Sequence, residues 1–294
     1  MNNPDSYINR TLDCARNSRN SGDYINAIKC MKKLVAAYPF EESYWLILGS
    51  DYEKLELLDQ AIDCFKRAVQ QNPLCDLAYA GLGRANMAKG SLDLADSAFR
   101  SAISIKPTAP RYILVGNIQR NLGHIDDARR SFLKAIELEP NNIEALGNAA
   151  STSSSGDPDY AETCLRKILS INPENAPALA ELAYILSSIF GRHDEAERLC
   201  RLAINKDYNN IWYHVYLANI LWSKCLLNDA EQEYLIACRV SNDNQDESTA
   251  LSLLGDYYNK TSRRDDALRC LRKAMELSPG DSDIQKKYIQ IENQ

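Results

Sequence analysis

Eight alanines recur along almost the whole chain at a nearly constant spacing. They are Ala27, Ala61, Ala95, Ala128, Ala161, Ala196, Ala230 and Ala267, separated by 34, 34, 33, 33, 35, 34 and 37 residues. A period near 34 residues is typical of arrays in which each repeat is a pair of α-helices. Such arrays offer an extended surface in place of one deep catalytic cleft. The spacing therefore predicts an all-α solenoid and favours a binding function.

Other residues recur at fixed distances from each alanine. A core residue follows four positions later, as with Phe65, Phe99 and Phe132, and a mostly small residue follows seven positions later. These spacings place the three side chains on one face of a helix. A proline stands twelve positions after most of the alanines, where it would end that helix. Each alanine therefore marks the second helix of its repeat.

The preceding helix has its own pattern, seen in Trp45, Leu48, Gly49 and Tyr52. Small residues let two helices approach closely, and large side chains fill the remaining space. An Asp or Asn stands two positions before most of the alanines, as Asp59 does. We expect these side chains to cap the second helices by accepting hydrogen bonds from free backbone N–H groups.

The combined pattern resembles the tetratricopeptide repeat, which reads W-x-x-L-G-x-x-Y, then A-x-x-x-F-x-x-A, then P. The resemblance covers about residues 8 to 281 and implies a right-handed superhelix of helix pairs. We expect a single array followed by a capping helix at 282–294, whose polar outer side would cover the last apolar face. The repeats are framed as 8–41, 42–75, 76–108, 109–141, 142–175, 176–210, 211–247 and 248–281.

Repeats five to seven depart from the pattern. Serine and threonine occupy 151–155, where leucine and aromatic residues are expected, and such residues weaken a helix. This segment is either a degenerate repeat that still packs or a hinge. After repeat seven, the acidic segment SNDNQDEST is expected to be a solvated loop.

Composition excludes several classes of function. The net charge of -6 argues against general nucleic-acid binding, which needs a dense basic surface. No apolar run is long enough to span a membrane, and the N-terminal residues lack the apolar stretch of a secretion signal. The cysteines have no metal-ligand spacing, and several follow their repeat alanine by three residues, as Cys30 and Cys64 do. We expect buried thiols in a reducing compartment, and hence a cytoplasmic protein.

No catalytic arrangement is evident. The three histidines lie in different repeats, and His214 occupies a position where Trp45 and Tyr79 stand in other repeats, so packing is its expected role. The sequence has no glycine-rich phosphate loop, nucleophile elbow or metal motif. We therefore expect no enzyme activity, no catalytic residue, no cofactor and no metal.

The resemblance implies that the first helices line a concave groove. Residues in the groove positions are the predicted partner-binding set. They are Arg16, Arg19, Arg84, Asn117, Arg120, Asn121, Tyr184, Trp212, Tyr216, Asn219 and Trp222. Arginine and asparagine suit carboxylates and peptide backbone, and aromatic residues suit an anchoring role. Two alternatives remain open: the charges are merely solvated, or the aromatic residues repair packing beside the degenerate repeat.

The function predicted from these features is a protein-interaction scaffold that binds an extended or helical segment of another protein. The alternative is a non-catalytic targeting module that presents substrates to a separately encoded enzyme. Some tetratricopeptide proteins bind acidic chaperone tails through a two-carboxylate clamp. Its expected positions here hold Arg16, Ser50, Ala80 and Arg84, without the central asparagine and the lysines, which argues against that subtype. The sequence leaves the oligomeric state and the partner's identity open.

Overall fold

The computed structural model describes residues 4–293, and this range contains helices and turns but no strand. The chain divides into two compact units, Met1–Asn148 and Ala149–Gln294, called unit 1 and unit 2 below. Helix α9 (Ile143–Ser153) contributes residues to both units. The prediction of an all-α helical repeat is confirmed.

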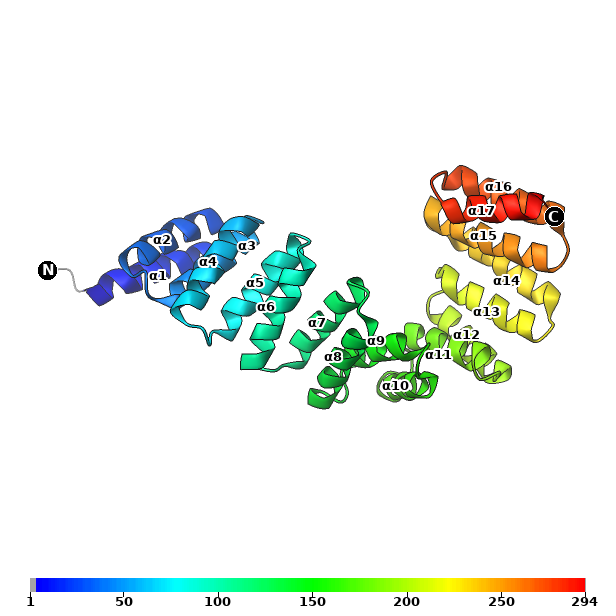
Figure 1. Cartoon of the computed structure of the whole chain (residues 1–294), viewed down its shortest axis with the longest axis horizontal. Coiled ribbons are helices and arrows are strands. Elements are labelled where there is room, and N and C mark those ends of the chain that lie inside the picture. The colour runs from blue at the N-terminus through cyan, green and yellow to red at the C-terminus, as the bar shows by residue number, and fades with distance from the viewer. Residues whose placement is uncertain (1–3, 294) are drawn as a thin grey trace. The chain divides into compact units, whose positions relative to one another are not determined.

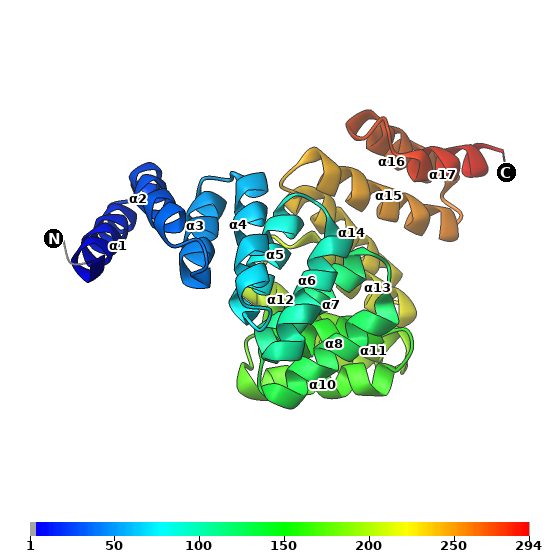
Figure 2. The same cartoon turned by 60° about the vertical axis from the view of Figure 1, so that its left-hand side comes forward.

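Each repeat contributes two successive helices, and these pack against each other in such pairs as α1 with α2 and α15 with α16 (Figure 1). Besides α9, the first helices are α1 (Pro4–Asn20), α3 (Glu42–Lys54), α5 (Asp76–Ala88), α7 (Ala109–Asn121), α11 (Ala176–Ser188), α13 (Ile211–Ser223) and α15 (Asn244–Lys260). The second helices are α2 (Tyr24–Ala37), α4 (Leu58–Gln71), α6 (Leu92–Ile105), α8 (Ile125–Leu138), α10 (Pro158–Ile171), α12 (His193–Lys206), α14 (Leu227–Val240) and α16 (Arg264–Leu277). Helix α17 (Ser282–Glu292) follows and packs on α16, as both views show (Figures 1 and 2).

First helices of neighbouring repeats also touch one another. In unit 1, α3 contacts α5; in unit 2, α11 contacts α13, and α13 contacts α15. Each of these helices therefore packs against its own second helix and against at least one neighbouring first helix. We call the outer surface of α11, α13 and the adjoining end of α9 the first-helix face of unit 2.

Glycine and phenylalanine fit together between the helices of a repeat. The Phe99 ring is 1% exposed and lies against Gly83, where an added Cβ would come within 2.7 Å of the ring. Phe132 stands in the same relation to Gly116. All eight recurring alanines are fully buried. The expected close approach of paired helices is confirmed, and it holds because the glycine leaves room for a full ring.

The expected capping by aspartate is wrong for most second helices. In α4 the N-cap is Leu57, which makes no side-chain capping bond, and Asp59 lies inside the first turn. There its negative charge interacts favourably with the positive end of the helix dipole, although its carboxylate accepts no capping hydrogen bond. Helices α2 and α10 do have an aspartate N-cap whose carboxylate accepts a backbone N–H, but these residues, Asp23 and Asp157, stand four positions before the repeat alanine and not two.

The acidic segment after repeat seven is mostly helical, contrary to the expected loop. Helix α15 begins at Asn244, and the Asp243 side chain caps it by accepting from the Asp246 backbone N–H. The buried Ser248 hydroxyl donates to the backbone carbonyl of Ala274. These contacts give the polar segment the partners that a helix end requires.

Two cysteines differ from the expected free thiols. Cys14 of α1 and Cys30 of α2 are paired as a disulfide, with their Cα atoms 6.6 Å apart. Cys64, Cys164 and Cys200 are free and buried, as expected of small apolar groups, and burial raises the pKa of the Cys64 and Cys200 thiols to about 12.

Helix α9 is short and is packed through small residues. It has 11 residues, and Ala145, Ala149 and Ala150 are fully buried. The Ser153 hydroxyl is buried without a hydrogen-bond partner among the described residues. Alanine methyl groups bury little apolar area, and Leu146 is the one large side chain of α9 that is almost fully buried.

We expect backbone amides in 146–156 to exchange with solvent faster than those in 44–57, because local opening costs less where apolar contacts are few. Hydrogen exchange followed by mass spectrometry measures both segments in one experiment. Equal protection of the two segments would show that repeat five is as firmly packed as repeat two.

Candidate functional site

The predicted arginines of repeats one and three are held by carboxylates of their own chain. Arg84 forms two parallel bonds of 2.8 Å to Glu53, and the same contact raises the pKa of the arginine. Arg19 lies 2.9 Å from Asp51, whose side chain is almost fully buried. Arg16 is exposed and pairs with Asp13. A partner's carboxylate would have to displace these acidic residues.

The polar residues of repeat four form a small network with Asn148 of repeat five. Arg120 donates to the side-chain oxygens of Asn117 and Asn148, at 3.1 and 3.0 Å. Asn121 is exposed and lies next to Arg120 in the chain, at the end of α7. Unit 1 therefore presents arginines whose donors are partly used within the fold.

Three of the predicted aromatic residues meet on the first-helix face of unit 2. Tyr184 comes from α11, and Trp212 and Tyr216 come from successive turns of α13. The ring centroids of Tyr184 and Tyr216 are 5.3 Å apart, and those of Trp212 and Tyr216 are 6.4 Å apart. Tyr184 is 46% exposed and Trp212 is 45% exposed, so these rings are not filling the core.

A hollow of about 470 Å³ opens beside these rings. Ser151 and Ser154 line it from the end of α9 and the turn after it, together with Pro177 and Ala180 of α11 and Asn210 before α13. Both serines belong to the 151–155 segment of the degenerate repeat five, and their short side chains take up little of this space. We call this hollow, with Tyr184, Trp212 and Tyr216, the aromatic pocket.

Glu181 also lines the aromatic pocket, and the sequence analysis missed it. It is the one charged residue of α11, and within the described chain no residue forms an ion pair or hydrogen bond with its carboxylate. Burial raises the pKa of Glu181 above its ordinary value. A single acidic residue three positions before Tyr184, in a helix of alanine and leucine, was the available signal.

The last two predicted residues lie further along unit 2. Asn219 is exposed and accepts a hydrogen bond of 2.7 Å from the Tyr234 hydroxyl. Trp222 packs edge-on against Tyr257, with ring centroids 5.4 Å apart, so packing against α15 occupies part of its surface. Neither residue lines the aromatic pocket.

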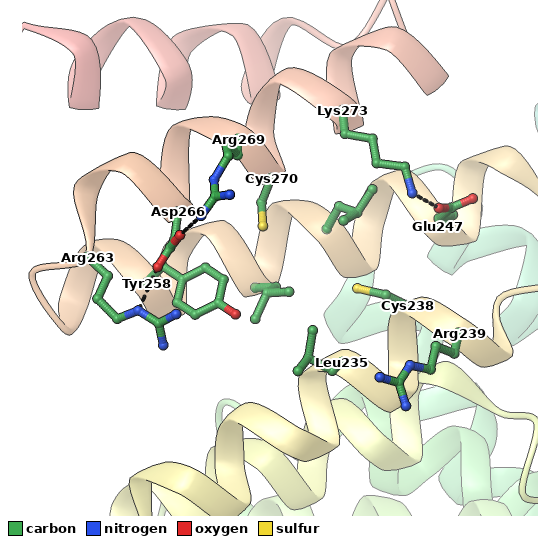
Figure 3. Close-up of a pocket in the computed structure, with 12 residues that line it drawn as sticks. Leu235, Cys238, Arg239, Glu247, Tyr258, Arg263, Asp266, Arg269, Cys270 and Lys273 are labelled. Carbon is green, nitrogen blue, oxygen red and sulfur yellow. Dashed lines mark hydrogen bonds and ion pairs between the residues drawn. The ribbon is translucent and has the colours of Figure 1, made fainter.

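A second hollow, of about 540 Å³, lies between α14, α15 and α16 (Figure 3). Its charged residues largely pair with one another: Lys273 contacts Glu247 at 2.6 Å, and Asp266 contacts both Arg263 and Arg269. Tyr258 donates to Glu231. This hollow therefore offers few unpaired charges to a ligand.

No group of three or more metal-ligating side chains was found among residues 4–293, and no helix in that range is both long and apolar enough to cross a bilayer.

His214 is buried, and its ring nitrogens lie 2.7 Å from Glu233 and 2.9 Å from the Tyr208 carbonyl oxygen. The structure therefore gives His214 the packing role expected of it.

Comparison with known protein families finds the same kind of repeat in three segments of the chain. Models of the tetratricopeptide repeat match residues 48–110, 109–142 and 248–281. Protein bimA of Emericella nidulans is 29% identical over 86 residues, which are 29% of this chain and 11% of that protein. The chain thus matches only a small part of this relative.

Solved structures share the fold. A tetratricopeptide repeat protein from Parabacteroides merdae is 19% identical, with a TM-score of 0.66 over 85% of this chain and 98% of that one. YrrB, a tetratricopeptide repeat protein with an unusual peptide-binding site, is 16% identical, with a TM-score of 0.57 over 62% of this chain and 95% of its own. MamA is 26% identical, with a TM-score of 0.53 over 58% of this chain and 94% of its own.

Proposed function

The chain belongs to the tetratricopeptide repeat family, and we propose that it is a protein-interaction module that binds a segment of a partner protein in the aromatic pocket of unit 2. The observation that carries this proposal is the group of half-exposed rings, Tyr184 and Trp212 around Tyr216, beside an open hollow. Large aromatic side chains held rigidly at a surface are the usual anchors of protein interfaces.

The packing alternative accounts less well for these residues. A ring that repaired the packing of repeat five would be buried, yet Tyr184 and Trp212 each keep nearly half of their surface exposed. The hollow beside them remains open, and its volume falls in the range of ligand pockets, roughly 300–1,000 Å³. That YrrB, a protein of this fold, has a peptide-binding site supports a peptide segment as the class of ligand.

The test is to select a binding peptide from a random library on the full-length protein and to follow its titration by NMR. The three tryptophan indole N–H groups serve as reporters, because Trp212 lines the pocket while Trp45 lies in unit 1 and donates to the Pro39 carbonyl. We expect the Trp212 signal to shift and the Trp45 signal to stay. Trp212→Ala should weaken binding about thirtyfold, the loss typical of a hot-spot anchor.

Phe40→Ala is the matched control, since it removes an aromatic ring that is 82% exposed and lies in unit 1. This variant should bind the peptide like wild type. A peptide that shifts only Trp45, or that binds the Trp212 variant with unchanged affinity, would place the binding surface elsewhere.

A further inference from the structure

Building on the interaction function above, we propose that the aromatic pocket takes up a basic side chain, arginine or lysine, of the partner segment. Glu181 is its counter-ion, and the rings of Tyr184, Trp212 and Tyr216 are the surface on which the cation lies. The exposed rings alone do not specify the chemistry of the ligand, whereas Glu181 does.

The formal charge that lines the pocket is negative. Of the residues that line it, Glu181 is the one that carries a formal charge at neutral pH. The other polar groups facing it are the hydroxyls of Ser151, Ser154 and the tyrosines, with the amide of Asn210. Helix α13, on the other side of the hollow, contains no aspartate, glutamate, lysine or arginine. An acidic ligand would therefore meet an uncompensated negative charge, and a basic one would neutralise it.

The carboxylate of Glu181 is unlike the other interior carboxylates of the chain. Asp51 is buried beside Arg19, and the partly buried Glu233 lies beside His214. Glu181 has no such partner among residues 4–293 and acts electrostatically on the Tyr216 hydroxyl, whose pKa is raised by burial and then by this charge. A half-buried charge without a counter-ion is unfavourable unless a partner supplies one.

The rings suit a cation for a second, independent reason. The faces of tyrosine and tryptophan carry negative electrostatic potential and attract ammonium and guanidinium groups within about 6 Å, more strongly where water is excluded. This chain uses the same contact internally, because the Arg67 guanidinium lies 4.9 Å from the Trp45 ring and that of Arg263 lies 4.3 Å from Tyr258. In the aromatic pocket no such cation is present within the described chain.

The proposed role of Glu181 also makes a prediction about the stability of the chain. Because burial raises the pKa of Glu181, its charged form is disfavoured in the folded state, and this group's contribution to stability is lost as the pH rises through that raised pKa. Glu181→Gln, which keeps the shape, should therefore melt at or above the wild-type temperature at neutral pH. A residue that costs stability but is needed for binding fits a functional site.

The experiment uses nonapeptides of glycine, serine and alanine with one variable central residue, titrated into the full-length protein and followed at the Trp212 indole. The central residue is arginine, its neutral analogue citrulline, lysine, leucine or glutamate. We expect the arginine and lysine peptides to shift the signal with an affinity at least about tenfold above that of the citrulline, leucine and glutamate peptides. Glu181→Gln should remove this preference while the protein stays folded.

Asp229→Asn is the matched control, because it removes an exposed carboxylate from the first turn of α14 in the same unit. It should leave the preference for arginine intact. Equal binding of the leucine or citrulline peptide would overturn the assignment of a basic ligand and leave the proposed function standing. If no peptide moves the Trp212 signal and the library-selected peptide binds elsewhere, both proposals fail.

Discussion

Phe99→Ala is expected to lower the free energy of unfolding by about 3–5 kcal/mol, the cost of emptying a fully packed aromatic site. The ring is 1% exposed and lies against Gly83, which has no side chain of its own to fill the space that the ring would leave. Because stability in a stacked array depends on each repeat and its interfaces, the loss should be greatest for α5, α6 and α7. Chemical denaturation of the full chain measures the loss of unfolding free energy, and hydrogen exchange shows in which helices the loss occurs.

Leu94→Ala is the control on the same helix, since Leu94 is 61% exposed. It should change stability by no more than about 0.5 kcal/mol. A complementary variant, Gly83→Ala, should destabilise wild type but be tolerated better together with Phe99→Leu, because the smaller side chain leaves room for the new Cβ. If Phe99→Ala and Leu94→Ala cost the same, the close packing of the helix pair is wrong.

His214→Ala is expected to cost about 3 kcal/mol, because loss of the buried ring leaves its hydrogen-bond partners without compensation. The His214 side chain is 1% exposed, and that of its partner Glu233 is 15% exposed. The ring also bonds the Tyr208 carbonyl, in the repeat where tyrosine stands in place of the closing proline. Loss of the ring would thus leave a carboxylate and a carbonyl oxygen unpaired.

His124→Ala tests whether any histidine would give this result. His124 is exposed at the start of α8 and makes no side-chain capping bond, so its loss should have little effect on the melting temperature. Similar melting temperatures for the two variants would contradict a structural role for His214.

The fold could be predicted from the sequence because its determinants are periodic. In repeats two to four the alanine, the phenylalanine four positions later and a glycine of the preceding helix recur in register, and each phenylalanine lies against the glycine of its own repeat. Features that depend on neighbouring repeats were not predictable in this way. Two ion pairs, Arg84 with Glu53 and Arg19 with Asp51, join residues that are about one repeat apart in the sequence. Only the structure shows that the members of each pair lie side by side.

The candidate site was predicted in part for the same reason. Tyr184, Trp212 and Tyr216 stand in groove positions, which identified them as possible anchors, and the structure brings them together. Glu181 was missed because the one available signal, a single acidic residue in an apolar helix, does not distinguish an unpaired carboxylate from a solvated one. Glu181 stands out only because no counter-ion faces it across the hollow, and this depends on how α11 and α13 pack together.

The most direct measurement of the central claim is quantitative affinity purification from the native cell, with three forms of the full-length protein compared by mass spectrometry. These are wild type, the double variant Trp212→Ala with Tyr216→Ala, and Phe40→Ala. A protein-interaction module that uses the aromatic pocket predicts that partners recovered with wild type and with the Phe40 variant are lost from the double variant, while its helicity is unchanged. Recovery of the same partners by the folded double variant would contradict the claim.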